Sequence, residues 1–168
     1  HIAGEADTIT HMASQAALKA IEEAGIDPKE IDLVISHGSQ HKDHLVWNSG
    51  AKIQYNIGAV NAYSFEMYAL CAGAPIAMNM AKGMMLGDPS LETVLLVAGS
   101  KENELLNFQN PRSRFMFNFG SGGGAMLLRR NAGKNLVLGA SAFTDGSLSE
   151  SVILTEEAIP AGEAEVVG

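Results

Sequence analysis

The stretch that decides the fold runs from residue 61 to residue 75 and reads Asn61-Ala62-Tyr63-Ser64-Phe65-Glu66-Met67-Tyr68-Ala69-Leu70-Cys71-Ala72-Gly73-Ala74-Pro75. Its first part alternates aromatic residues with small or polar ones, a pattern typical of a strand. From Pro75 onward, Ile76, Met80 and Met84 recur at helical spacing, and proline is tolerated in the first turn of a helix. The stretch therefore predicts a strand that runs into a helix, with Cys71 at the junction.

Cys71 is the only cysteine of the chain. A thiol at the start of a helix faces unpaired backbone N–H groups and the positive end of the helix dipole, and both favour the thiolate, which is the nucleophilic form. The small residues Ala72 and Gly73 leave room for a substrate to reach the sulfur. Placement alone leaves two interpretations open, a nucleophile and a small buried hydrophobic residue.

The composition indicates a globular protein with a real core. Of the 168 residues, 46% are hydrophobic and 18% are charged. The formal net charge of −8 argues against nucleic acid and anionic membranes as partners. A single cysteine forms no internal disulfide, so we expect a reducing, cytoplasmic compartment. The chain has no starting Met and no apolar run as long as a membrane span, and we expect it to be part of a longer protein.

Helix and strand patterns alternate along the chain. Helices are predicted from Thr8 or Thr10 to Glu23, with Gly25 ending the helix, and from about Leu45 to Tyr55, and strands over 31–36, 94–98, 125–128 and 136–143. This alternation predicts an α/β fold with a mixed sheet flanked by helices. The first domain is expected to span residues 1–150, and a weakly patterned tail spans residues 151–168.

Further short motifs stand in a fixed order around Cys71. They are Ile2-Ala3, Ala24-Gly25-Ile26, Ile31-Asp32-Leu33-Val34-Ile35, Ile53-Gln54, Ile57-Gly58, Phe65 six residues before Cys71-Ala72-Gly73, Val97-Ala98-Gly99-Ser100, and Phe119-Gly120-Ser121-Gly122-Gly123-Gly124-Ala125. In this order and spacing the chain, from His1 to about Ser151, resembles the first half of a β-ketoacyl-acyl-carrier-protein synthase III, in the thiolase superfamily.

The resemblance implies an architecture for the whole protein. Members of the family have two similar halves, each a sheet between helices, stacked as five layers (αβαβα). Residues 1–150 would then be an N-terminal thiolase-like half-domain, and residues 151–168 would lead to a second half that this sequence lacks. Family members dimerise by continuing the sheet through the strand before the nucleophile, which implies a homodimer through Asn61–Phe65.

The resemblance also implies a reaction, in fatty acid biosynthesis. Cys71 would attack an acyl-coenzyme A, hold the acyl group as a thioester, and help to bind the oxyanion through its own backbone N–H. The acyl group would then condense with a malonyl-type thioester on acyl-carrier protein. No cofactor is implied, because acyl-CoA is a substrate. Arg112 and Arg114 lie close to the position of a family arginine that touches coenzyme A, although surface arginines without a ligand are an equally good interpretation.

Several features depart from the family pattern. The family's condensing His and Asn lie in its second half, and all five histidines of this chain precede Cys71. The family's first strand is missing as well, so we expect this segment alone to be inactive. Ser121 replaces the family's usual Asp, and Ala74-Pro75 replaces an aromatic residue. A non-catalytic thiolase-like subunit and a non-condensing acyltransferase therefore stay open as alternatives.

Three other groups of residues carry weaker hypotheses. Gly120–Gly124 could cradle a phosphate, but a strand pattern follows it, which favours a tight turn with close backbone packing. His37, His41, His44 and Asp43 could bind a metal, but the surrounding loop lacks a rigid frame, so we expect no metal site and a hydrated polar loop. Glu66 could act as an acid or a base, and a solvated turn residue is the favoured interpretation.

Overall fold

The structure is a computed structural model that describes residues 3–151, 153–154 and 166–167. Its principal elements are α1 (Ile9–Ala24), β1 (Leu33–Ser36), α2 (Ser49–Asn56), β2 (Tyr63–Glu66), α3 (Gly73–Gly87), β3 (Thr93–Ser100) and β4 (Gly122–Arg129). Short 3-10 helices lie between them: η1 (Pro28–Glu30), η2 (Leu70–Ala72), η3 (Glu102–Leu105), η4 (Pro111–Met116) and η5 (Gly146–Leu148). The short strands β5 (Ile153–Leu154) and β6 (Val166–Val167) pair antiparallel with each other.

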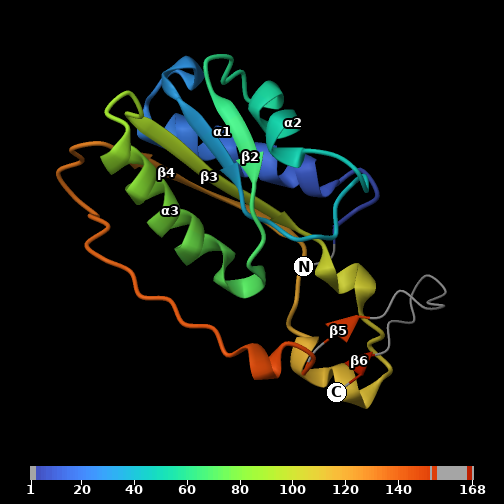
Figure 1. Ribbon diagram of the computed structural model, residues 1–168. Coiled ribbons are helices and arrows are strands. Elements are labelled where there is room, and N and C mark those ends of the chain that lie inside the picture. The colour runs from blue at the N-terminus through green and yellow to red at the C-terminus, as the bar shows by residue number, and fades with distance from the viewer. Residues whose placement is uncertain (1–2, 152, 155–165, 168) are drawn as a thin grey trace.

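The four longer strands form one mixed sheet in the order β2-β1-β3-β4. β1 runs parallel to both β2 and β3, and β4 runs antiparallel to β3. Helices α1 and α2 lie on one face of the sheet and α3 lies on the other (Figure 1). The predicted α/β class, a mixed sheet flanked by helices, is confirmed.

The core has two parts, one on each face of the central strands. Val34 of β1 packs with the helices α1 and α2, whereas its neighbours Leu33 and Ile35 pack against α3. In β3, Leu95 and Val97 face the first core, and Val94 and Leu96 face the second. Because side chains alternate across a strand, a sheet covered on both faces requires an unbroken apolar run. The apolar runs read from the sequence are therefore the two central strands.

The ends of the helices follow from capping residues. Thr8 caps α1 by accepting the His11 N–H, and Gly25 ends it in the left-handed conformation (φ 64°), so the predicted boundaries of this helix are confirmed. The second helix was predicted to begin near Leu45, which is wrong. It begins at Ser49, because the extended Asn48 caps it through the Ala51 N–H at 3.0 Å.

The glycine-rich segment is a strand and not a turn. Gly122–Gly124 are the first residues of β4, paired with the end of β3, so the expected tight turn is wrong. The expected close backbone packing is present, because a methyl group added at Gly123 would overlap the backbone oxygen of Met12 in α1. A methyl group at Gly99 would overlap the backbone oxygen of Ile9 in the same way. These two glycines let α1 lie directly on β3 and β4.

The strand predicted over residues 136–143 is also wrong. Leu136 and Leu138 alternate as in a strand, but among the described residues this segment belongs to no sheet and both side chains are exposed. Lys82 of α3 donates to the backbone oxygens of Val137 and Leu138, at 2.8 Å each. A strand needs a neighbouring strand to pair with, and the apolar pattern does not report whether one is there. Most of the predicted tail, 151–168, lies outside the described residues.

Candidate active site

Cys71 lies where the carboxyl ends of two parallel strands meet. β1 ends at Ser36 and β2 ends at Glu66, in register with each other. Parallel strands direct their following loops to the same edge of the sheet, where open α/β folds bind their ligands. The loop after β1 and the segment that carries Cys71 therefore share one edge, and the Cys71 side chain is exposed there.

A sharp turn brings the chain from β2 to Cys71. Leu70 has a positive φ of 47°, which is rare for a residue with a side chain. Cys71 itself lies in the single 3-10 turn of η2, in which Ala72 donates its N–H to the Ala69 oxygen at 3.0 Å. Local strain of this kind is frequent at functional sites, where the surrounding structure holds it in place.

The helix that follows Cys71 begins without a side-chain cap. No side chain accepts a hydrogen bond from the start of α3, whereas Thr8 and Asn48 cap α1 and α2. The N-terminal N–H groups of a helix favour a negative charge nearby, and Cys71 immediately precedes this helix. The expected position of Cys71 at a helix start is thus present in the structure.

Gly73 brings α3 into contact with the end of β1. A methyl group at Gly73 would lie 2.8 Å from the backbone oxygen of His37 and 3.6 Å from the Nδ1 atom of its ring. Only glycine fits this approach, which places the half-buried His37 against Gly73, the first residue of α3 and the second residue after Cys71. Burial lowers the pKa of His37 below its ordinary value of 6.5, and a hydrogen bond with its own backbone, which raises the pKa, only partly opposes this effect. The imidazole is therefore neutral near pH 7.

His37 lies beside the segment that carries Cys71, a neighbour that the sequence analysis did not give it. It was considered with His41, His44 and Asp43 as a hydrated loop or a metal site. The available signal was its position directly after β1, since residues at the carboxyl ends of parallel strands converge.

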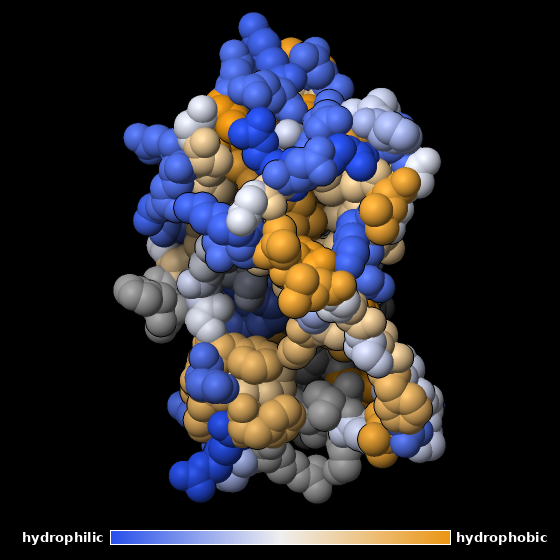
Figure 2. All heavy atoms as spheres, turned by 90° about the vertical axis from the view of Figure 1, so that its left-hand side faces the viewer, coloured by the Kyte–Doolittle hydropathy of each residue, from blue (hydrophilic) through white to orange (hydrophobic). Residues whose placement is uncertain are grey.

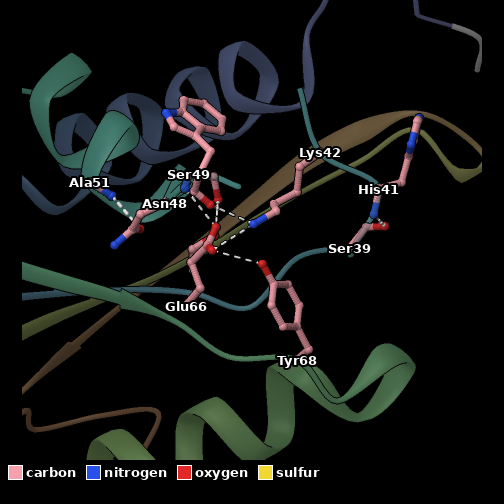
Figure 3. A network of polar contacts seen from close by, with 10 residues as sticks. Ser39, His41, Lys42, Asn48, Ser49, Ala51, Glu66 and Tyr68 are labelled. Carbon is pink, nitrogen blue, oxygen red and sulfur yellow. Dashed lines mark hydrogen bonds and ion pairs between the residues drawn. The ribbon is translucent and has the colours of Figure 1, made fainter. Parts of the chain in front are cut away.

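Glu66 is not a solvated turn residue, so that expectation is wrong. Its carboxylate accepts hydrogen bonds from the Ser49 N–H at 2.8 Å, the Tyr68 hydroxyl at 2.9 Å and the Lys42 ammonium at 3.1 Å (Figure 3). Burial by itself would raise the pKa of Glu66, but the hydrogen bonds from Ser49, Lys42 and Tyr68 outweigh it and lower the pKa. Glu66 is therefore ionised at neutral pH.

The rest of the histidine-rich loop is tied to its surroundings by separate contacts. The Asp43 carboxylate accepts the N–H groups of Ile9 and Thr10 at the start of α1, at 2.9 and 3.1 Å. His41 lies 3.4 Å from the Glu104 carboxylate, and the His44 ring meets the Trp47 ring edge-on. Among the described residues, no three His, Cys, Asp or Glu side chains lie close enough together to hold a metal ion.

The two arginines considered for coenzyme binding belong to η4. Arg114 is exposed, and the Arg112 side chain lies outside the described residues. Ser121, in place of the expected Asp, donates its hydroxyl to the Asn103 side chain at 2.5 Å. This contact links the start of β4 to the buried Asn103 of η3.

Comparison with known proteins points to one family. The sequence profile described as 3-oxoacyl-[acyl-carrier-protein (ACP)] synthase III matches residues 65–146, which include Cys71 and the glycine-rich segment. The β-ketoacyl-[acyl-carrier-protein] synthase III of Rickettsia canadensis is 33% identical over 146 residues, which are 87% of this chain and 45% of that protein. The chain is similar to the N-terminal half of proteins of the 3-oxoacyl-[acyl-carrier-protein] synthase III family. It spans about half the length of the curated relatives it matches, 45% to 48%, and corresponds to their N-terminal half.

Solved structures of this family share the fold. The 3-oxoacyl-[acyl-carrier-protein] synthase III of Aquifex aeolicus superposes with a TM-score of 0.83 at 27% identity, covering 98% of this chain and 51% of that chain. The priming β-ketosynthase of the R1128 polyketide pathway gives a TM-score of 0.68 at 31% identity, covering 76% of this chain and 37% of that chain. The thiolase-like fold is thereby confirmed. No helix among the described residues is long and apolar enough to cross a membrane.

Proposed function

We propose that the protein containing this chain is a condensing acyltransferase of the synthase III type, in which Cys71 accepts the acyl group. The observation that carries the proposal is the exposed Cys71 thiol on a strained turn, immediately before a helix that has no side-chain cap. The names of the relatives point to the same class of reaction. A thiolate held at a helix start suits transfer between thioesters, because its leaving group is also a thiol.

The first step is transfer of an acyl group from acyl-coenzyme A. The Cys71 thiolate attacks the thioester carbonyl carbon and forms a new carbon–sulfur bond. The oxyanion of the tetrahedral intermediate is held by backbone N–H groups, among which we propose that of Cys71. The bond to the coenzyme then breaks, and coenzyme A leaves as a thiolate that takes a proton from water. Arg112 and Arg114 are proposed to contact its nucleotide.

The second step joins the acyl group to a malonyl-type thioester on acyl-carrier protein. Loss of carbon dioxide from the malonyl group leaves a carbanion, which attacks the acyl-Cys71 carbonyl and releases the cysteine. We propose that the groups for this step lie in the half of the family that this chain does not span. The segment alone would then not condense acyl groups, and we expect it to be inactive by itself.

We also propose a homodimer through the strand Asn61–Phe65. β2 is an edge strand of the described sheet, with β1 on its only paired side, and Tyr63 is half exposed. An open edge presents unpaired N–H and C=O groups to which a second copy can add its own β2.

Intact-mass spectrometry of the full-length protein with acetyl-coenzyme A tests the first step. We expect a mass increase of one acetyl group in the wild-type protein and none in Cys71→Ser. Adding malonyl-acyl-carrier protein should then remove the acetyl group and yield a 3-oxoacyl product. An increase that survives Cys71→Ser would overturn the assignment of the nucleophile. An acyl group that is taken up and never condensed would favour the non-condensing alternatives.

A further inference from the structure

Glu66, the last residue of β2, is the centre of a polar network beside the Cys71 segment (Figure 3). Its Oε1 atom accepts hydrogen bonds from both the N–H and the hydroxyl of Ser49 at the start of α2. Its Oε2 atom accepts from the Lys42 ammonium and from the Tyr68 hydroxyl. Donors from three separate segments therefore occupy both carboxylate oxygens.

Lys42 connects the loop after β1 to this network through its contact with Glu66. Its ammonium group donates to the Trp47 backbone oxygen at 2.8 Å and lies 5.5 Å from the centre of the Tyr68 ring. Only 15% of the Lys42 side chain and 13% of the Glu66 side chain are exposed. Contact with Tyr68 raises the pKa of Lys42 against the opposing effect of burial, and Glu66 raises it further, so the pair is charged on both sides. Breaking one side of so buried a pair leaves the other charge uncompensated.

The same network fixes the turn that leads to Cys71. Met67 donates its N–H to the Ser36 oxygen at 2.9 Å, and the Tyr68 hydroxyl returns to Glu66 at 2.9 Å. Leu70 follows with its unfavourable positive φ. A residue in this conformation keeps it only where neighbouring contacts over-determine the backbone, and the contacts of Met67 and Tyr68 lie directly before it.

We propose that Lys42, Glu66 and Tyr68 form a positioning unit that holds Cys71 in its reactive place, an inference that rests on the proposed role of Cys71 as nucleophile. Lys42 and Glu66 clamp the loop after β1 to the end of β2, and Tyr68 ties the strained turn to that clamp. None of the three transfers a proton in the reaction. Glu66 is ionised and already accepts from four donors, so it has no place for a proton from substrate.

The unit has a consequence that can be measured at Cys71. The pair is neutral as a whole, so removing one partner leaves a single charge near the thiol. An unpaired Glu66 carboxylate disfavours the Cys71 thiolate, whereas an unpaired Lys42 ammonium favours it. Other titratable groups at this edge, in the part of the chain that the structure describes, are His37 beside Gly73, the Tyr68 hydroxyl, and Asp43, whose carboxylate accepts the Ile9 and Thr10 N–H groups. The Lys101–Glu104–His41 cluster contacts the same loop through His41.

The experiment is the pH profile of Cys71 alkylation by iodoacetamide, a neutral reagent, followed by intact mass in the full-length protein. We expect Lys42→Met to move the midpoint of the profile upward and Glu66→Gln to move it downward. Each shift should be about 0.3–1 pH unit, the order of magnitude for one unpaired charge that solvent partly screens. The double variant should return close to the wild-type midpoint. A purely structural loosening would move both single variants in the same direction.

Tyr68→Phe tests positioning without a change of charge and carries little risk to folding. We expect an unchanged midpoint and a rate of Cys71 acylation by acetyl-coenzyme A lowered by about tenfold or more, because a small misplacement of a reacting group is costly. Glu104→Gln is the matched control. It removes a carboxylate that is paired with a lysine, Lys101, but that lies after β3 and forms no hydrogen bond or ion pair with Glu66 or Tyr68 in the described part of the chain, so it should change neither quantity.

Shifts of the same sign in Lys42→Met and Glu66→Gln, or a full acylation rate in Tyr68→Phe, would overturn the positioning unit. The proposed function fails separately. If the wild-type protein takes no acyl group from acetyl-coenzyme A, Cys71 is not the acyl acceptor, while the alkylation profile still decides whether the three residues control the thiol.

Discussion

Two carboxylates at the edge of the sheet where β1 and β2 end, Glu66 and Asp43, are held ionised by hydrogen-bond donors from neighbouring segments. Burial would raise the pKa of each, but the hydrogen bonds from Ser49, Lys42 and Tyr68 to Glu66, and from Thr8, Ile9 and Thr10 to Asp43, outweigh it. A group with a lowered pKa in the folded state stabilises the fold above its ordinary pKa and loses that contribution as the pH falls.

Above about pH 5 both carboxylates are ionised in the folded and in the unfolded state. We therefore expect their contribution to the free energy of unfolding to change little with pH in that range. It should fall as the pH drops below the ordinary values of 4.5 for Glu66 and 3.8 for Asp43. Glu66→Gln should lower stability at pH 7 by about 2 kcal/mol and make the acid loss smaller. Denaturant unfolding at several pH values measures both effects.

Glu23→Gln serves as the control and should leave the acid profile unchanged. Among the described residues, the exposed Glu23 side chain forms only a surface ion pair, with Lys19. An acid profile that is the same in Glu66→Gln as in the wild-type protein would contradict the stabilising role of the Glu66 hydrogen bonds.

The packing of α1 on β4 depends on glycine at one position of the strand. A methyl group at Gly123 would overlap the backbone of Met12, and backbone cannot move aside as a side chain can. Gly123→Ala should therefore lower the free energy of unfolding by about 1–3 kcal/mol. Thermal or denaturant unfolding of the purified variant measures the loss.

Gly83 of α3 is the matched position, because a methyl group there meets nothing within 4 Å. Gly83→Ala should stabilise the protein by about 0.5–1 kcal/mol, the difference in helix propensity. If Gly123→Ala were as stable as the wild-type protein, the direct contact of α1 with β4 would be wrong. A loss of stability in Gly83→Ala would indicate that further chain covers the outer face of α3.

At the scale of the whole molecule, several large apolar side chains of the described residues are exposed to solvent. Leu86 at the end of α3 is 71% exposed, and Leu138 and Phe143 are 84% and 90% exposed. Figure 2, seen from the side on which residues 131–145 run, shows apolar side chains gathered at the surface between hydrophilic regions. Contiguous exposed apolar surface marks a place that another surface covers.

We therefore expect that residues 1–168, expressed alone, do not form a stable monomer. Sedimentation velocity should show a dimer or larger species, and the segment should form a single species when the half of the family that it does not span is supplied. Sedimentation as a monodisperse monomer that unfolds cooperatively would contradict this expectation.

By itself, the sequence determined the properties that local patterns carry. The alternation of strand and helix, the apolar runs of β1 and β3, the caps of α1 and the place of Cys71 before a helix were all predicted, because side-chain period and capping act within a few residues. The motifs around Cys71 also identified the family correctly.

Only the tertiary structure decided what depends on partners distant in the chain. The sequence suggested that Glu66 is a turn residue, because it does not show the contact with Lys42, 24 positions away. It suggested a turn at Gly123, because it does not show that Met12 lies against this glycine. Residues 136–143 have the period of a strand, but strand formation depends on a neighbour that the period does not encode. Local periodicity specifies which face of an element is buried, whereas hydrogen bonds and close backbone contacts depend on which distant segment meets that face.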